Sequence, residues 1–334
     1  MPDFTIPSTL FTGGDATSYD LPNYFGELYS LMPQEVPFLS MIGGLNGGRE
    51  VSSRDFTWEV QDGEAASATA QKLENQDPTG NLVTRQAVSN VVEIHQEAVE
   101  FGYTAQAVTG QLGPLAPNAT TGVALDGSQS IMDPMANQIN LKIGKVKRDL
   151  EMSFLNGTIN VPTTNAAARR TQGIIAATTS HAVNYTTGSY TTIRDALNDL
   201  LLDMAAPSDE ANTAPFRQPF IMVIPAQKIT LSNEYSNSGA LAPRDRSVGG
   251  VNIDTLVTDF GTFGVAMNRY VPAGTLLVVD VSVCRPVHLS IPGKGSFFVE
   301  PLAKTGATDK AQLYGEIGLE YGPETFHGKI TAIT

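Results

Sequence analysis

The sequence predicts an α+β fold in which helices and strands occupy separate parts of the chain. Three observations support this class: a long amphipathic helix follows a β-hairpin, a mixed region follows the helix, and the chain after residue 251 consists mostly of strands and turns. The 334 residues contain neither a βαβαβ alternation nor an internal repeat. A doubly wound parallel sheet and a solenoid are therefore not expected.

The first 50 residues predict an extended arm with one short helix. Asp20 is a suitable N-cap and Pro22 suits the first turn. Four apolar residues follow at helical spacing, namely Leu21, Phe25, Leu28 and Met32. The apolar stretch "PFLSMI" (37–42) comes next, and the glycines after it predict a hinge: Gly43, Gly44, Gly47 and Gly48.

Two strands are expected next, over residues 51–60 and 86–101. In the first strand Phe56, Trp58 and Val60 alternate with polar residues, whereas the sequence between the two strands is small and polar. If the strands pair, they form a long hairpin without a core of its own, and such a ribbon is at best marginally stable in water. The hypothesis is that Trp58, the only tryptophan, finds its partners in another chain.

The most regular helix is predicted over 134–156, after a covering loop rich in Gly, Pro and Ala over 104–132. Asp133 and Pro134 supply the cap and the first turn, and Gly157 supplies the stop. Apolar residues recur every three to four positions: Met135, Ile139, Ile143, Val146, Leu150 and Phe154.

Beyond this helix the chain mixes the two kinds of element. Residues 190–204 predict a second amphipathic helix, "FIMVIPA" (220–226) a buried strand ended by Pro225, and 226–235 a third helix. Cys284 lies in the apolar run "LLVVDVSVC" and is expected to be a small buried hydrophobic residue. As the only cysteine, it forms no internal disulfide.

The charge is strongly acidic. The chain has 34 acidic and 21 basic residues, a formal net charge of −13 and a pI near 4.7. This balance disfavours non-specific binding to nucleic acid and to anionic lipid. Lys and Arg are absent from 1–48, and no apolar run approaches the length of about 18 residues that spans a bilayer. We therefore expect neither a secretory signal nor a membrane span, and a cytoplasmic product.

No catalytic or cofactor motif is present. The phosphate-binding loop, the dinucleotide-binding glycine motif, the nucleophile elbow and the zinc-protease helix motif are all missing from the sequence. Glu93, His95 and Glu97 would share one face of a strand, either as a site for a metal ion or as a solvated or inter-subunit face. The sequence thus predicts no enzyme, no cofactor and no metal site, with a hydrolase of unrecognised site as an alternative of another class.

One basic cluster stands out. Lys142, Lys145, Lys147 and Arg148 all lie on the predicted long helix. Three interpretations are open: a weak contact with nucleic acid, the solvated face of an amphipathic helix, or pairing with Glu and Asp of a neighbour.

These parts, in this order, resemble the major capsid protein of tailed bacteriophages, which has the Hong Kong 97 fold. "EVPFLSMIGG" (35–44) resembles the arm motif of one branch of that family, "FTWEVQD" (56–62) the start of its extended loop, and "KVKRDLEMSFLNGT" (145–158) the end of its spine helix. "RRTQGI" (169–174) is similar to the segment that leads into the axial domain. The most specific stretch, 300–330, resembles the C-terminal strands of that branch.

The resemblance implies five parts of the chain. These are an N-terminal arm (1–50), an extended β-hairpin loop (51–101), a peripheral domain (102–160) with its spine helix at 134–156, an axial domain (161–284) and C-terminal strands that return to the peripheral domain (285–334).

The resemblance also implies the function. Copies of such a protein assemble into hexamers and pentamers and then into an icosahedral head shell that encloses double-stranded DNA, contacted only non-specifically. The implied partners are other copies of the chain and portal, scaffolding and decoration proteins, with no membrane. The implied location is the virion, after assembly in the host cytoplasm. An encapsulin-like nanocompartment shell is the alternative.

The residues implied in contacts between subunits lie on the arm and the extended loop: Phe38, Trp58, Glu59, Lys72, Glu74 and Asp77. Lys72 is the only lysine of the loop, and some relatives join such a lysine to an asparagine of a neighbour by an isopeptide bond. The basic face of the spine helix is represented by Lys142, Lys145 and Arg148.

Overall fold

The computed structural model describes most of the chain. Described are residues 35–104, 134–205, 213–236, 246–248 and 251–333, except the single positions 62, 65, 66, 68, 76, 78, 79, 81, 165 and 305. The predicted helix over 20–32 and all but the first residue of the predicted covering loop lie outside these ranges.

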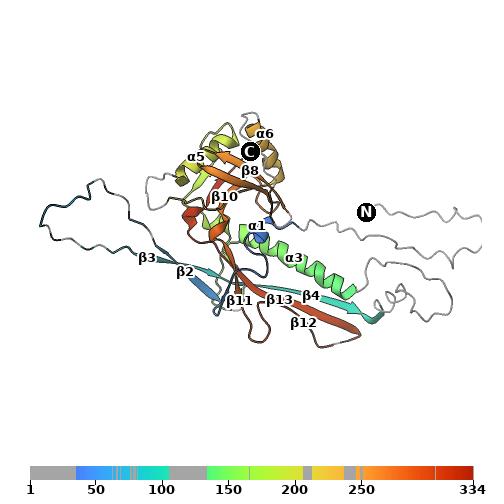
Figure 1. Cartoon of the computed structure of the whole chain (residues 1–334). Coiled ribbons are helices and arrows are strands. Elements are labelled where there is room, and N and C mark those ends of the chain that lie inside the picture. Colours follow the sequence, from blue (N-terminus) through green and yellow to red (C-terminus); the bar gives the residue numbers. More distant parts are fainter. Residues whose placement is uncertain are drawn as a thin grey trace, which may run out of the picture.

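An elongated sheet of five strands forms one half of the body (Figure 1). At its centre is β13 (Thr308–Glu320), the longest strand. β4 (Glu93–Gly102) pairs with one edge of β13 over ten residue pairs. The other edge of β13 is shared by β12 (Phe297–Pro301) and β11 (Arg285–Leu289), and β1 (Arg49–Val51) adds in parallel to β11.

A sheet of seven strands forms the other half. Its order is β5-β14-β10-β6-β9-β8-β7. The strands are β5 (Ala182–Asn184), β6 (Pro219–Val223), β7 (Arg246–Val248), β8 (Val251–Thr258), β9 (Gly261–Met267), β10 (Leu276–Asp280) and β14 (Gly328–Thr331).

The long helix α3 (Pro134–Asn156) has the predicted bounds and lies along the five-stranded sheet beside β4 (Figure 1). Helices α5 (Ile193–Ala205) and α6 (Pro225–Ser236) cover one face of the seven-stranded sheet. The short helices are α1 (Pro37–Met41) and α4 (Ile174–Ala177), with single 3₁₀ turns η3 (Val281–Val283) and η4 (Glu324–Phe326). Among the described residues no helix is both long and apolar enough to cross a membrane.

Both faces of the seven-stranded sheet are buried. Successive side chains of its central strands point to opposite faces, and each face packs into a different core. Met222, Leu277 and Val279 join the core that contains α1, α3 and the five-stranded sheet. Their neighbours Ile221 and Leu276 join the second core, under α5 and α6. The two halves are thus connected by a sheet that belongs to both cores.

The predicted hairpin exists, but it is shorter than expected. β2 (Asp55–Gln61) pairs antiparallel with β3 (Arg85–Val91), from Asp55 opposite Val91 to Gln61 opposite Arg85. The predicted second strand over 86–101 is in fact two strands, because the chain leaves the hairpin at Val92 and continues as β4 in the five-stranded sheet. The assignment of all of 51–101 to an extended loop is therefore wrong for β4.

The predicted C-terminal part is also divided between the two halves. β11, β12 and β13 lie in the five-stranded sheet with α3 alongside, whereas β14 pairs with β10 and β5 in the seven-stranded sheet. The expectation that all of 285–334 returns to the half with the long helix is wrong for β14. Cys284 is buried, as predicted.

Candidate functional site

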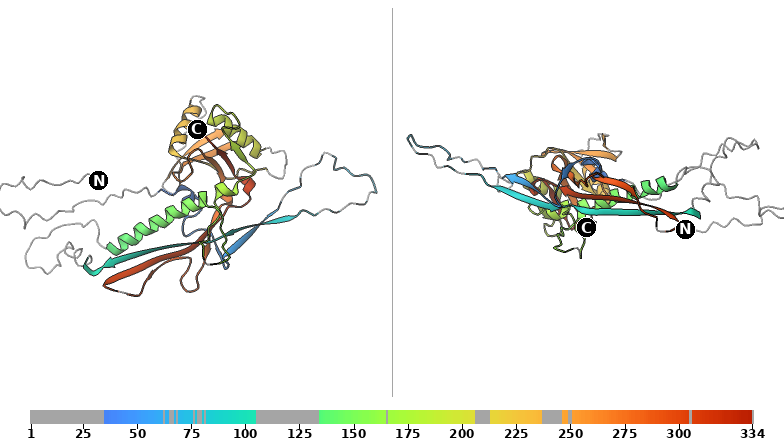
Figure 2. Two further views of the ribbon diagram at one scale, coloured as in Figure 1. Left: turned by 180° about the vertical axis from the view of Figure 1, so that it is seen from behind. Right: turned by 90° about the horizontal axis from the view of Figure 1, so that it is seen from below.

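Two paired strands and the exposed segment between them form a ribbon, here defined as β2, β3 and the tip 62–84. In both views of Figure 2 the ribbon projects from the body at the end opposite the free end of β4. Every described residue of the tip is exposed except half-buried Val83, and the Leu73 and Leu82 side chains are 80% and 90% exposed. The described residues of the tip therefore belong to neither of the two cores of the subunit.

The root of the ribbon, in contrast, is firmly packed. Phe56 and Trp58 are buried in the first core, while their strand neighbours are exposed. The Trp58 ring packs edge-on against the Tyr321 ring, with 5.0 Å between the two ring centroids. Its Nε1 donates a hydrogen bond to the Gly322 carbonyl at 3.1 Å. Burial raises the pKa of the Tyr321 hydroxyl to about 12, so this ring stays neutral.

Asn90 fixes the second strand of the ribbon. Its Nδ2 donates to the carbonyls of Leu319 and Gln172, at 2.7 and 3.2 Å, and its Oδ1 accepts from the Gln172 N–H at 2.8 Å. The side chain is only 2% exposed. Because the bonds join β3 to β13 and to the segment before α4, the ribbon cannot swing freely about its root.

Two predicted inter-subunit residues are core residues of the subunit. Trp58 is 8% exposed and Phe38 is fully buried, and both belong to the first core. The hypothesis that Trp58 finds its partners in another chain is wrong. Within the same chain, its ring packs against Tyr321 and its N–H donates to the Gly322 carbonyl. Phe38 is equally unavailable to a neighbour.

The arm enters the body through α1, and a buried carboxylate holds that entry. The Glu151 side chain, on α3, accepts the N–H groups of Phe38 at 2.9 Å and Leu39 at 2.6 Å. These donors lie in the first turn of α1, whose N-cap Val36 has no side chain able to accept them. The Asn268 amide donates to the same carboxylate at 2.6 Å. Glu151 thus ties α1, α3 and the residue after β9 together.

The Glu151 carboxyl is fully shielded from water. Burial raises its pKa to about 7, and the hydrogen bonds from Leu39, Phe38 and Asn268 only partly oppose the rise. The sequence gives one signal for this residue: a carboxylate that directly follows Leu150 in the apolar stripe of the helix.

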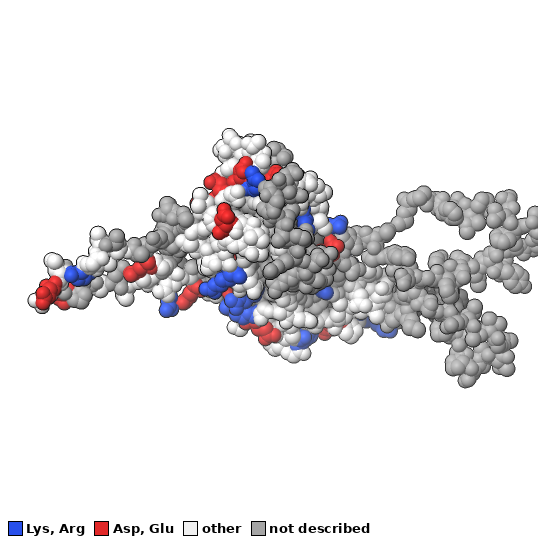
Figure 3. Space-filling model, turned by 45° about the horizontal axis from the view of Figure 1, so that its top comes forward, with Lys and Arg blue, Asp and Glu red and all other residues white. Residues whose placement is uncertain are grey.

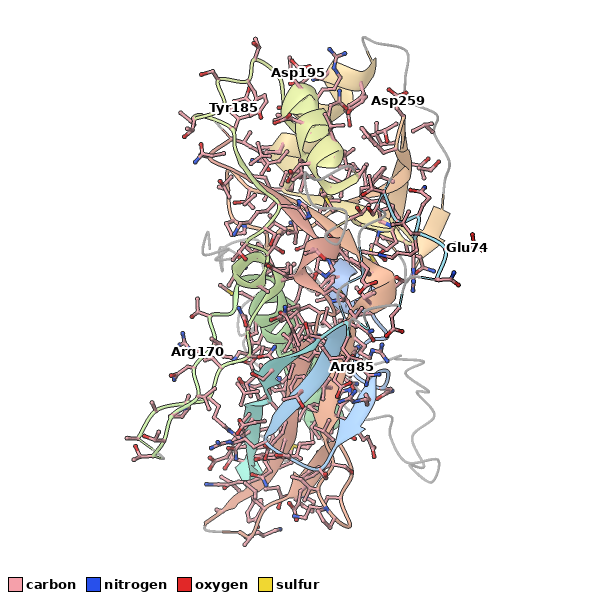
Figure 4. All side chains as sticks on the ribbon, turned by 90° about the vertical axis from the view of Figure 1, so that its left-hand side faces the viewer. Glu74, Arg85, Arg170, Tyr185, Asp195 and Asp259 are labelled. Carbon is pink, nitrogen blue, oxygen red and sulfur yellow. The ribbon has the colours of Figure 1, made fainter. Side chains whose placement is uncertain are left out.

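The remaining predicted ribbon residues are on the surface. Glu59 pairs with Arg85 across the two strands at 3.2 Å, and both side chains are more than half exposed. Lys72, Glu74 and Asp77 are exposed on the tip. Figure 3 shows acidic side chains next to a basic one at the far end of the ribbon, and Figure 4 places Glu74 on its outer part and Arg85 nearer the root.

The basic face of α3 is partly neutralised within the subunit. Lys142 and Lys145 both donate to the Glu97 carboxylate on β4, the first at 2.8 Å. Burial alone would raise the pKa of Glu97, but the two ammonium groups outweigh it and hold the pKa below its ordinary value. The structure therefore favours the pairing with acidic neighbours, and Arg148 remains half-buried without a described ion pair.

The alternative of a metal site at Glu93, His95 and Glu97 has no support in the geometry. His95 Nε2 lies 2.8 Å from Glu93 Oε1, while Glu97 is occupied by the two lysines. The other Glu93 oxygen accepts the Thr171 N–H at 3.1 Å. Within the described ranges no group of His, Cys, Asp and Glu side chains is arranged to hold a metal ion.

A hollow lies on the half with the seven-stranded sheet. It has a volume of about 640 Å³ and is formed by α5, the end of α6 and the turn between β8 and β9. Three aspartates line it, Asp195, Asp199 and Asp259, together with one arginine, Arg194, and the exposed side chains of Leu202 and Val257. Figure 4 places Asp195 and Asp259 at the same end of the molecule.

The comparison with protein families gives a match over nearly the whole chain. The family model described as SU10 major capsid protein matches residues 9–334. No curated protein matches the sequence.

Solved structures with a similar fold include capsids and one related shell. The capsid of the cyanophage P-SCSP1u has a TM-score of 0.59 at 11% identity, over 97% of this chain and 96% of that chain. The capsid of the Myoviridae phage XM1 has a TM-score of 0.58 at 13% identity, over 96% and 100%. The SrpI encapsulin of Synechococcus elongatus PCC 7942 has a TM-score of 0.56 at 13% identity, over 94% and 92%. The predicted mixed helix-and-sheet fold of the capsid type is confirmed over nearly the whole chain.

Proposed function

The chain belongs to the SU10 major capsid protein family, and from this premise we propose how its copies build a shell. It is a shell-forming capsid protein of a bacteriophage, and the observation that carries the proposal is the ribbon. Trp58 and Asn90 hold the root of this strand pair in the subunit, whereas the described residues of its tip present an exposed surface that another subunit can cover. The ribbon therefore serves as the extended loop that lies over an adjacent subunit.

The other parts receive roles that follow from their position. Residues 1–50 act as the arm, and α3 with the five-stranded sheet forms the peripheral domain. The seven-stranded sheet with α5 and α6 forms the axial domain, which clusters around the five-fold and six-fold axes. Its acidic hollow, with two exposed apolar side chains, suits a contact between copies because apolar surface is removed from water there.

Deletion of residues 62–82 tests the ribbon assignment. We expect a soluble, folded subunit that forms no stable shells, because both cores lie outside the deleted segment. Circular dichroism checks the subunit and negative-stain microscopy checks the particles. Shells of normal size and number from the deleted chain would refute the assignment.

An encapsulin-like compartment is the second candidate, since the fold is similar to that of the SrpI encapsulin at nearly the same TM-score as the phage capsids. The family match supports the phage capsid. The content of purified particles separates the two: packaged double-stranded DNA supports the capsid, and an enclosed enzyme supports the compartment.

Further partners and the location belong to the same proposal. Portal, scaffolding and decoration proteins are the expected partners besides other copies of the chain, which assembles in the host cytoplasm and resides in the virion. The net charge of −13 supports a shell that holds DNA only non-specifically. We assign the protein no enzymatic activity, no cofactor and no isopeptide bond at Lys72.

A further inference from the structure

A groove lies where the arm enters the body. Its volume is about 430 Å³, and it runs between α1, the turn after it, α3 and β12. The walls are mainly apolar, formed by Val36, Leu39, Leu45, Ile143 and Phe297. This volume lies within the range of about 300–1,000 Å³ found for concave binding pockets.

The groove has one charged group at its wall. Lys147 lines it, and no carboxylate does. The neighbouring lysines on α3, Lys142 and Lys145, are both bound to Glu97, whereas Lys147 is exposed and forms no ion pair within the described part of the chain. An occupant that combines an apolar side chain with an adjacent carboxylate fits these walls best.

The tip of the ribbon has this chemistry. Leu73 is 80% exposed and is followed directly by Glu74. Residues 62–84 contain four acidic residues and one lysine, which gives a net charge of −3. The ribbon projects away from α1, α3 and β12, so the tip cannot fold onto the groove of its own subunit (Figures 1 and 2).

We propose that the groove receives the ribbon tip of a second copy of this chain, with Leu73 between the apolar walls and Glu74 facing Lys147. The inference rests on the proposed role of the ribbon and adds the surface on the neighbour that accepts it. Burial of Leu73 removes a large apolar side chain from water, and the ion pair at the rim sets the register of the tip.

Such a contact is heterologous, because the tip of one copy binds a different surface on the next. A heterologous contact builds a closed ring where its rotation closes, as it does around the five-fold and six-fold axes of the proposed shell. The same pair of surfaces therefore serves every subunit of a hexamer or a pentamer.

Cysteine cross-linking tests the contact. One chain carries Leu73→Cys and another carries Ser40→Cys, which lines the groove; the native Cys284 is buried and does not interfere. We expect disulfide-linked dimers after mild oxidation of particles assembled from the mixture. Particles containing only one of the two variants serve as controls and give no dimers at these positions.

The part of the arm that precedes α1 is the competing occupant, since the chain enters the body at Val36, which lines the groove. Leu28→Cys replaces Leu73→Cys in a parallel mixture with Ser40→Cys. Cross-links to position 28 and none to position 73 would overturn the proposal in favour of the arm. If normal shells assemble from the mixture and position 73 gives no cross-link, the groove assignment fails. The role of the ribbon between subunits is then decided separately by the deletion of residues 62–82. Absence of shells from the unmodified chain would instead defeat the proposed function.

Charge reversal gives a second readout. Lys147→Glu and Glu74→Lys should each lose most of the assembled particles, and the double variant should recover them, because the ion pair is rebuilt with opposite sense. The matched control is Lys147→Glu combined with Glu64→Lys, which makes the same change in net charge and should not recover assembly. Equal recovery in both double variants would mean that only net charge matters, which contradicts the proposed pair.

Discussion

Trp58 makes two kinds of contact within the subunit, ring packing and one hydrogen bond from its N–H. Its faces and edges pack against Phe56 and Tyr321, and its N–H meets the Gly322 carbonyl. The carbonyl belongs to a residue 264 positions away in the sequence. The alternation of Phe56, Trp58 and Val60 correctly predicts a strand with one buried face, but it contains no information about which surface covers that face. For this reason the sequence suggested a neighbouring chain where the structure has the subunit core.

Replacement of Trp58 therefore acts on the subunit. Trp58→Ala should lower the free energy of unfolding by about 3 kcal/mol or more, the usual cost of truncating a large buried aromatic side chain. Trp58→Phe, which keeps an aromatic ring and loses only the N–H donor, should cost less. Urea unfolding followed by far-UV circular dichroism measures both. A change below about 0.5 kcal/mol for the alanine variant would contradict the core assignment.

At the scale of elements, the long helix and the hairpin differ in how far the sequence predicts them. The bounds of α3 are correct because the apolar period, the proline at its start and Gly157 after it agree. The second hairpin strand was predicted too long because no Gly or Pro marks the change at Val92, where the chain passes from the ribbon into the five-stranded sheet. Glu151 is recognisable in the sequence as a carboxylate directly after Leu150 of the apolar stripe. Its three hydrogen-bond donors come from elements distant in the sequence, so its role could not be predicted.

The contact between the ribbon and β13 depends on a glycine. A Cβ at Gly318 would lie 2.9 Å from the Phe56 ring and 2.9 Å from the Val91 carbonyl oxygen. Gly318→Ala should therefore displace the ribbon root and destabilise the subunit by about 1–3 kcal/mol. Gly80→Ala on the tip is the matched control, because nothing lies within 4 Å of a Cβ there. Thermal unfolding of both variants checks the difference, and equal midpoints would show that the root adapts without cost.

At the scale of the whole molecule, Glu151 joins parts that the chain keeps far apart. It connects the entry of the arm, the long helix and the segment after β9 through one carboxylate. α1 and α3 both contribute to the first core, which also contains Met222, Leu277 and Val279 of the seven-stranded sheet.

The stability of the subunit should respond to pH through this group. Its pKa is about 7 in the folded chain and 4.5 as the ordinary value, so the folded state holds the proton more tightly. The resulting stabilisation is complete below pH 4.5 and is lost as the pH rises through about 7, by at most about 3 kcal/mol. Urea unfolding of wild type and Glu151→Gln across this window measures it.

The difference between the two chains is the informative quantity. Burial lowers the pKa of His327 to about 4, so that histidine destabilises both chains as the pH falls below its ordinary value of 6.5. Subtracting the two profiles removes this shared contribution. A difference that stays constant from pH 4 to pH 8 would show that Glu151 does not change its protonation on folding.

The path from the ribbon into the sheet has a mechanical consequence. β3 ends at Val91 and β4 begins at Glu93, so tension on the ribbon passes through the backbone directly into β4. In Figure 1 the two strands follow one line, and β4 is held to β13 over ten residue pairs. A pull along that line loads these hydrogen bonds together, in shear, instead of opening them one after another. A particle under outward pressure would thus transmit its load along the strands that resist it best.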